Sequence, residues 1–129
     1  MIIDSSAIVA LVRREPAAVN VLDVIAKAAD VRVAAPVWLE TSIVLMGQRS
    51  GLNLDQVEQV RQQLGLQLVP FDGVHADAAH SAWLRFGKGR HPAGLNILDC
   101  MSYAAAMVAD EPLLFVGDDF AQTDVLRAA

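Results

Sequence analysis

The sequence predicts one α/β domain over residues 1–129, in which about four parallel strands form a sheet that is flanked by helices on both faces. Short apolar segments typical of strands alternate with amphipathic segments of helical spacing, and this alternation indicates a parallel sheet. The first strand is apolar at consecutive positions, as expected for a strand that is covered on both faces. No internal repeat, low-complexity tract or linker interrupts the chain, and 129 residues suffice for one sizeable core.

Each element in the first half of the chain has a local signal. Ser5 or Ser6 is an expected cap for the first helix, because hydroxyl side chains favour helix starts. Pro16 and Pro36 suit the first turns of the second and third helices, and Gly51 lies just beyond the end of the third. The expected strands are residues 1–3 and 31–34, and the expected helices are residues 5–14, 16–29, 36–50 and a fourth from Asn53 or Asp55 to 64.

The second half of the chain continues the alternation. Residues 87–94 combine glycine, proline and charge, which predicts a loop. Asn96 is the expected cap of the helix that follows this loop. A turn after residue 116 leads into a short last helix that ends near the C-terminus. The expected strands are residues 66–69 and 113–116, and the expected long helices are residues 73–86 and 96–109.

Composition excludes several classes of protein. A hydrophobic content of 54% argues against disorder, and no apolar run approaches the roughly 20 residues that span a bilayer. The N-terminus lacks the basic region of a signal peptide. The single cysteine, Cys100, excludes an internal disulfide and predicts a cytoplasmic location. A net charge of −5 argues against broad, salt-driven binding to nucleic acid, although metal ions would offset the charge of an acidic nuclease site.

Acidic residues in apolar surroundings carry the functional prediction. Asp4 directly follows the first strand, and the carboxyl ends of strands are where open α/β sheets bind ligands. Glu40 lies within the apolar third helix, Asp99 lies in the first turn of the sixth, and Asp118 and Asp119 follow the fourth strand. A buried, unpaired carboxylate costs several kcal/mol. Because few basic residues are placed to neutralise these acids, a shared divalent cation is the expected partner.

The acids also have structural alternatives. Asp4 can be the N-cap of the first helix, and Asp118 or Asp119 can cap the last one. Asp99 can be a first-turn acid that the helix dipole favours. Glu40 has the weakest structural alternative, because it is neither a cap nor clearly on the surface. If the acids converge, their oxygen ligands predict Mg²⁺, or Mn²⁺, and phosphodiester hydrolysis assisted by one or two ions.

Four segments together resemble a PIN-domain ribonuclease toxin of the VapC type, in the family's order and spacing over the whole chain. They are Met1-Ile2-Ile3-Asp4-Ser5-Ser6-Ala7, Leu39-Glu40-Thr41-Ser42, Gly94-Leu95-Asn96-Ile97-Leu98-Asp99-Cys100 and Leu113-Leu114-Phe115-Val116-Gly117-Asp118-Asp119-Phe120. The resemblance implies a single PIN domain that acts as a metal-dependent endoribonuclease, with Mg²⁺ as its cofactor. It also implies a homodimer that is the toxin of a type II toxin–antitoxin pair and is neutralised by a VapB-like antitoxin.

The same resemblance implies roles for individual residues. Asp4 and Asp99 correspond to the principal Mg²⁺ ligands, and Glu40 with an acid after the last strand completes a catalytic quartet. The motif position favours Asp119 as that fourth acid, with Asp118 as the alternative or as a contact through water. Two residues depart from the family pattern. Leu98 replaces a frequent glycine, which predicts altered helix packing, and Val116 replaces a frequent lysine, which removes a phosphate contact.

Other features are secondary to the acids. Arg85, Lys88 and Arg90 lie in the one densely basic stretch, which is either an RNA-backbone contact or a solvated loop. Ser6 is expected either to bond a metal-bound water or to cap the first helix. Cys100 is expected to be a small buried hydrophobic residue rather than a nucleophile. A set of apolar side chains forms either an exposed groove for an antitoxin helix or ordinary core, and its members are Met46, Leu52, Val57 and Val60.

Two other functions compete with the nuclease. A phosphoacceptor receiver domain needs a lysine after a later strand, and neither of the chain's two lysines, Lys27 and Lys88, follows a strand. A degenerate family member would bind only its protein partner. The RNA target is not encoded by a motif, although sequence-specific RNA recognition usually involves single-stranded loops, such as those of tRNA.

Overall fold

The computed structural model describes residues 1–128 as a four-stranded parallel sheet with helices packed against both faces. The strands are β1 (Ile2–Ile3), β2 (Val31–Ala34), β3 (Leu66–Val69) and β4 (Leu113–Leu114). The helices are α1 (Ser5–Val12), α2 (Ala18–Lys27), α3 (Ala35–Met46), α4 (Leu54–Gln63), α5 (Gly73–Phe86), α6 (Ile97–Ala109) and the 3₁₀ turn η1 (Phe120–Gln122). The predicted fold class is therefore confirmed.

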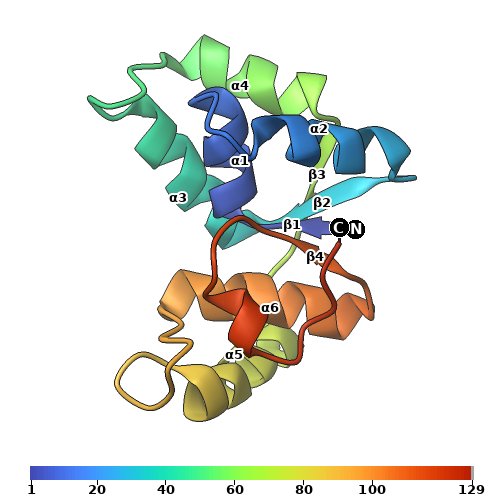
Figure 1. Cartoon of the computed structure of the whole chain (residues 1–129), viewed down its shortest axis with the longest axis vertical. Coiled ribbons are helices and arrows are strands. Elements are labelled where there is room, and N and C mark those ends of the chain that lie inside the picture. Colours follow the sequence, from blue (N-terminus) through green and yellow to red (C-terminus); the bar gives the residue numbers. More distant parts are fainter. Residues whose placement is uncertain (129) are drawn as a thin grey trace.

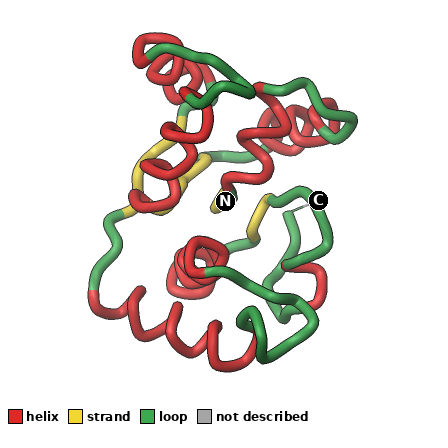
Figure 2. Tube along the Cα trace, turned by 90° about the vertical axis from the view of Figure 1, so that its left-hand side faces the viewer, coloured by secondary structure: helices red, strands yellow, loops and turns green. Residues whose placement is uncertain are grey.

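The sheet separates two layers of helices. Helices α1 to α4 cover one face, and α5 and α6 cover the other with the C-terminal segment beside them (Figure 1). Figure 2 shows the same two groups on either side of the strands. The strand order is β3-β2-β1-β4, so the chain builds outward from β1 to β3 and then returns to the other side of β1. This reversal beside β1 puts the topological switch point of the sheet at the carboxyl ends of β1 and β4, the usual ligand position in such sheets.

The central strand is covered completely, as its sequence predicts. Ile2 and Ile3 are fully buried, and β1 pairs in parallel with both β2 and β4. Ile3 aligns with Leu114 of β4, so the residue after each strand emerges at the same edge of the sheet. The core around this strand contains few aromatic residues and is formed largely by aliphatic side chains from both layers. None of the helices in residues 1–128 is long and apolar enough to cross a membrane.

The C-terminal region differs most from its prediction. Strand β4 ends at Leu114 instead of residue 116, because the backbone N–H of Val116 donates to the Ser6 hydroxyl and Gly117 then turns the chain at a φ of 101°. The expected last helix is only the three-residue turn η1. Thr123 ends that turn, because its hydroxyl and its backbone N–H both donate to the Phe120 carbonyl.

After this turn, the chain returns to the edge of the sheet. Leu113 donates its N–H to the Leu126 carbonyl and accepts from the Ala128 N–H, so residues 126–128 pair with β4. The last residue, 129, lies outside the described part of the chain.

Two helix starts agree with the sequence, and two other boundary predictions are wrong. Asn53 caps α4 and Asn96 caps α6, each through a reciprocal capping box. The third helix ends at Met46, several residues before Gly51, which adopts a φ of 67° in the following turn. The cap of α1 is Asp4, not Ser5 or Ser6, because the Asp4 carboxylate accepts the Ser6 N–H.

Candidate active site

Asp4 is a rigidly held carboxylate at the end of the central strand. Its side chain is almost fully buried, with 2% of its surface exposed. One oxygen, Oδ2, accepts the Ser6 N–H at 3.0 Å, and the other, Oδ1, accepts the Ser102 hydroxyl at 2.6 Å. The capping alternative for Asp4 is therefore correct, but the cap uses only one of the two oxygens. The hydrogen bond from Ser102 on α6 holds the other oxygen, Oδ1, in place.

Asp99 lies in the first turn of α6 and is electrostatically strained. Its Oδ2 accepts the backbone N–H of Asn96 at 3.0 Å as part of the capping box. Burial is the main reason that the pKa of Asp99 is raised to about 6, although the Asn96 N–H acts against this rise. Three neighbouring negative charges raise the pKa further, and they belong to Asp4, Asp119 and Glu40. The structure thus brings three of the predicted acids close enough to act on Asp99.

Glu40 and Asp119 reach this cluster from opposite layers. Burial on α3, followed by the charge of Asp4, raises the pKa of the Glu40 carboxyl. Asp119 precedes η1, but its side chain makes no capping hydrogen bond, so it does not serve as the cap that the sequence offered as an alternative. Asp118 is exposed and is not among the charges that raise the pKa of Asp99. Of these two exposed acids, only Asp119 acts on the pKa of Asp99, and Asp119 is therefore the better candidate for the fourth acid.

The acid cluster suits a hydrated divalent cation. Within residues 1–128, none of the four acids forms an ion pair with Lys, Arg or His. No three His, Cys, Asp or Glu side chains of this part of the chain lie close enough to hold one ion directly. Mg²⁺ commonly takes one or two protein carboxylates and keeps several waters, whereas Zn²⁺ prefers three or four nitrogen and sulfur ligands. The donor set thus fits Mg²⁺, with Asp4 and Asp99 as the most buried oxygen donors.

Ser102 is a site residue that the sequence reasoning missed. Its side chain is fully buried on α6, and its hydroxyl donates to Asp4 across the interface between α6 and β1. Ser102 follows Asp99 by three residues, so both side chains lie on one face of the helix. A lone hydroxyl at this spacing within an apolar helix was the available signal. Ser6 also has a role that was not predicted, because its hydroxyl accepts the Val116 N–H and joins α1 to the end of β4.

Two of the three basic side chains in the basic stretch, Arg85 and Arg90, make contacts within the protein. Arg85 donates to Asp124 at 2.9 Å and stacks over the Phe86 ring. Arg90 donates to the Leu84 carbonyl and lies 4.9 Å from the centre of the Trp83 ring. Lys88 is exposed and forms no ion pair within the described residues. The loop leads directly into α6, whose first turn carries Asp99.

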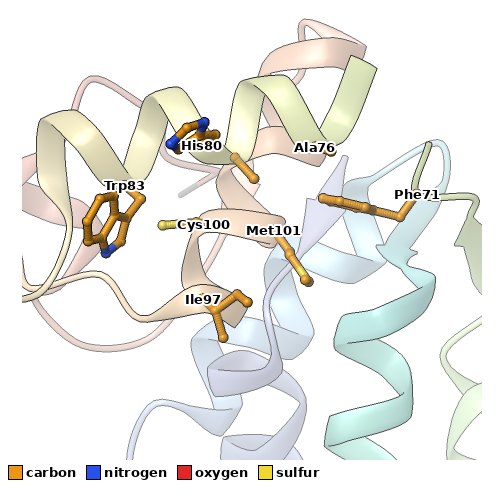
Figure 3. Close-up of a pocket in the computed structure, with 8 residues that line it drawn as sticks. Phe71, Ala76, His80, Trp83, Ile97, Cys100 and Met101 are labelled. Carbon is orange, nitrogen blue, oxygen red and sulfur yellow. The ribbon is translucent and has the colours of Figure 1, made fainter. Parts of the chain in front are cut away.

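A groove between α5 and α6 is distinct from the acid cluster. It has a volume of about 410 Å³ and is lined mainly by apolar side chains, including Trp83, Ile97 and Met101 (Figure 3). At about 100° per residue, Asp99 projects about 200° around the helix axis from Ile97 and Met101. The groove and the acids therefore lie on different sides of α6. Cys100 also lines the groove and is buried, and burial raises the pKa of its thiol to about 11, so its predicted role as a packing residue is confirmed.

Comparisons with known proteins agree with this architecture. Residues 1–126 match the family model described as PIN domain. Ribonuclease VapC36 of Mycobacterium tuberculosis is 44% identical over 126 residues, which cover 97% of this chain and 91% of that protein. Ribonuclease VapC of Mycolicibacterium smegmatis is 42% identical over 128 residues, with 97% of each chain covered.

Two solved structures share the fold at low sequence identity. The crystal structure of Mycobacterium tuberculosis VapC20, a sarcin-ricin loop cleaving toxin, superposes with a TM-score of 0.73 at 15% identity and covers 97% of this chain and 95% of that one. A toxin–antitoxin complex from Klebsiella pneumoniae superposes with a TM-score of 0.72 at 14% identity and covers 99% and 97%. These two likenesses concern the fold alone. The family match and the curated relatives together show that this chain belongs to the PIN-domain family, among the VapC ribonucleases.

Proposed function

We propose that this protein is a Mg²⁺-dependent endoribonuclease that hydrolyses phosphodiester bonds in RNA and acts as the toxin of a type II toxin–antitoxin pair. The observation that carries the proposal is the cluster of Asp4, Glu40, Asp99 and Asp119. The charges of the other three raise the pKa of Asp99, and none of the four acids has a cationic partner among residues 1–128. Folding such a cluster is costly unless a bound cation offsets the repulsion. The ribonuclease names of the curated relatives support RNA as the substrate class.

The surroundings of each acid in the cluster suggest a different role in metal binding or catalysis. Asp4 and Asp99 would be the direct ligands, because both are held by hydrogen bonds and so would lose little freedom on binding. Bound Mg²⁺, or Mn²⁺, would lower the pKa of a water and stabilise charge on the phosphoryl group. Glu40 has a raised pKa and is the candidate to accept the proton from the attacking water. Asp119 would add negative charge beside the cation.

The basic loop supplies the contact to the RNA backbone. Lys88 is the strongest candidate, since it is exposed and without an ion pair in residues 1–128, and Arg90 lies beside it on the Trp83 ring. Such side chains position phosphates without reading the sequence. A single-stranded loop in a structured RNA, such as a tRNA loop, is the proposed target.

Removal of divalent cations tests the proposed chemistry. After dialysis against EDTA, the protein is expected to lose cleavage of total cellular RNA, and addition of Mg²⁺ or Mn²⁺ is expected to restore it. Ca²⁺ is the matched control, because it binds oxygen ligands but accepts looser geometry and coordination. Cleavage fragments resolved by sequencing gels would be the readout. Undiminished cleavage in EDTA would show that the acids do not work through a metal.

An apolar groove within the helix layer formed by α1 to α4 is the proposed antitoxin site. The groove has a volume of about 370 Å³, and α1, α2 and α4 contribute to its wall with the segment before α4. Leu52 and Val60 line it, as the groove alternative predicts, whereas Val57 is buried core and Met46 is exposed outside the lining. An amphipathic antitoxin helix fits such a surface. The toxin–antitoxin complex with the same fold supports this partner class.

Leu22→Glu tests this groove, because Leu22 lines it and is 52% exposed. The substitution should weaken binding of a VapB-like antitoxin by about 100-fold, as expected when a charge enters an apolar contact. Val74→Glu on α5 is the control, since Val74 is also exposed but lies outside the groove. Surface plasmon resonance with an immobilised VapB-like antitoxin provides the measurement. Equal affinity of both variants would exclude the groove.

The proposed homodimer has a separate candidate surface. The groove in Figure 3 exposes Trp83 and Ile97, and α3 exposes Leu39, Ile43 and Met46 along one stripe. A two-fold dimer would bury such surfaces against their copies. Sedimentation equilibrium should show a dimer for the wild type and a monomer for Ile97→Glu, with Val19→Glu on α2 as the control. A monomeric wild type would exclude the dimer.

A further inference from the structure

Three polar side chains from three distant segments meet beside α6. Arg85 comes from the last turn of α5, Tyr103 from α6 and Asp124 from the C-terminal segment. The Tyr103 hydroxyl donates to Asp124 Oδ1 at 2.5 Å, and the Arg85 guanidinium donates to Asp124 Oδ2 at 2.9 Å. Arg85 also reaches the Tyr103 hydroxyl at 3.4 Å. Both carboxylate oxygens of Asp124 are therefore held.

The hydrogen bond from Tyr103 to Asp124 is the most sheltered of these contacts, whereas Arg85 and Asp124 form a half-exposed ion pair. Tyr103 is almost fully buried, and burial, followed by its bond to Asp124, raises the pKa of its phenol to about 12. The hydrogen bond from Tyr103 is in turn the main reason that the pKa of Asp124 is lowered. Hydrogen bonds to an ionised carboxylate are short and roughly twice as strong as neutral ones. Phe86 supports the group, because Arg85 lies over its ring and Tyr103 packs beside it.

The segment that contains Asp124 also carries Asp119. Between β4 and residue 126 this segment has only the three-residue turn η1, so its backbone bonds alone hold it weakly. Phe120 anchors one side by packing against Phe115 in the core. Asp119 itself is exposed and makes no capping hydrogen bond that would fix its position. Its place beside Asp99 therefore depends on the anchors on the two sides of the turn.

We propose that Arg85, Tyr103 and Asp124 are positioning residues that hold the Asp119 turn against the metal site. The inference rests on the proposed function, since it assigns these residues to the same acid cluster. It also changes the role of Arg85, which the sequence suggested as an RNA contact. With its guanidinium engaged by Asp124 and Phe86, Arg85 acts within the protein, and the phosphate contacts fall to Lys88 and Arg90.

Two nearly isosteric variants of the full-length protein test the proposal. Tyr103→Phe removes only the hydroxyl, and Asp124→Asn removes the charge from an exposed side chain. Hydrogen exchange of residues 117–123 should become faster in both variants. Mn²⁺ binding, followed by loss of the free-ion EPR signal, should weaken about tenfold, as is typical when a group that supports a metal site is removed. Arg85→Lys should retain part of the affinity, because it keeps the charge near Asp124.

The control is Arg61→Gln, which removes an exposed ion pair with Glu58 on α4 and should change neither readout. Faster exchange with unchanged Mn²⁺ affinity would overturn the positioning role, and so would unchanged exchange. If Tyr103→Phe fails to fold, Asp124→Asn decides the question. Absence of Mn²⁺ binding in the wild type would instead refute the metal site of the proposed function. Hydrogen exchange of residues 117–123 would still test whether Arg85, Tyr103 and Asp124 hold the Asp119 turn.

The chain's single tyrosine provides an independent signature. Ultraviolet titration of the wild type should show the Tyr103 phenol ionising near 12, and Asp124→Asn should move this midpoint toward the ordinary value of about 10. An unchanged midpoint would show that Asp124 does not bind the Tyr103 hydroxyl in solution, and it would overturn the positioning role of these residues.

Discussion

Replacing either Asp4 or Asp99 with asparagine is expected to reduce RNA cleavage by at least about 1,000-fold, which corresponds to about 4 kcal/mol of transition-state stabilisation. Asparagine has the shape of aspartate but lacks the charge that a hard cation requires. At Asp4, the amide oxygen still accepts one of the two present hydrogen bonds, from Ser6 or Ser102. Activity should therefore fall without loss of the fold.

The measurement is the initial cleavage rate of a labelled RNA, together with circular dichroism melting of each variant. Asp118→Asn is the matched control, because Asp118 is an exposed acid of the same turn that does not act on Asp99. Asp119→Asn should lose activity where Asp118→Asn does not. Rates near that of the wild type in both Asp4→Asn and Asp99→Asn would refute the proposed nuclease site.

Asp99→Asn is also expected to stabilise the metal-free protein at neutral pH. The pKa of Asp99 is about 6 in the folded protein and about 3.8 when unperturbed, so the folded state holds its proton more tightly. The associated stability is fully present below about pH 4 and is lost as the pH rises through about 6. At pH 7.5 the ionised carboxylate therefore destabilises the fold, and the neutral amide avoids this cost.

The size of this effect follows from the same shift. A rise from 3.8 to about 6 corresponds to at most about 3 kcal/mol, which solvent screening at this partly exposed side chain reduces to about 1–2 kcal/mol. Urea unfolding in EDTA should show the stability difference between Asp99→Asn and the wild type growing from pH 4 to pH 7. Asp118→Asn serves again as the control.

Mg²⁺ should reduce the stability difference between Asp99→Asn and the wild type, because it binds the folded wild type and not the variant. A variant that is less stable than the wild type at pH 7.5 would contradict the electrostatic cost assigned to Asp99. Together, the two predictions state that one carboxylate lowers stability while it supports catalysis.

The local signals in the sequence were sufficient for most elements. Asn96 is the expected cap of the sixth helix, and Asn53 is one of the two expected starts of the fourth, with Asp55 as the other. Asn53 and Asn96 both form capping boxes in the structure. The apolar run before Asp4 predicted a strand covered on both faces, and Ile2 and Ile3 are fully buried. These predictions succeeded because capping and strand burial depend on residues that are neighbours in the chain.

The C-terminal region was predicted less well because distant partners decide it. The end of β4 depends on Ser6, more than 100 residues away, whose hydroxyl takes the Val116 N–H. The last helix is reduced to η1 because residues 126–128 return to pair with Leu113. Local propensity contains neither of these contacts, so it extended both elements too far.

The sequence by itself determined the fold class, the family and the acids to be considered, since strand burial, helix capping and motif order are properties of short segments. Only the tertiary structure decided how those acids are used. It brought the charge of Asp119 close enough to raise the pKa of Asp99, joined Ser102 to Asp4, and paired Arg85 with Asp124. The physical reason is that electrostatic and hydrogen-bond energies depend on distances of a few ångströms between side chains, and folding sets those distances between residues far apart in the chain.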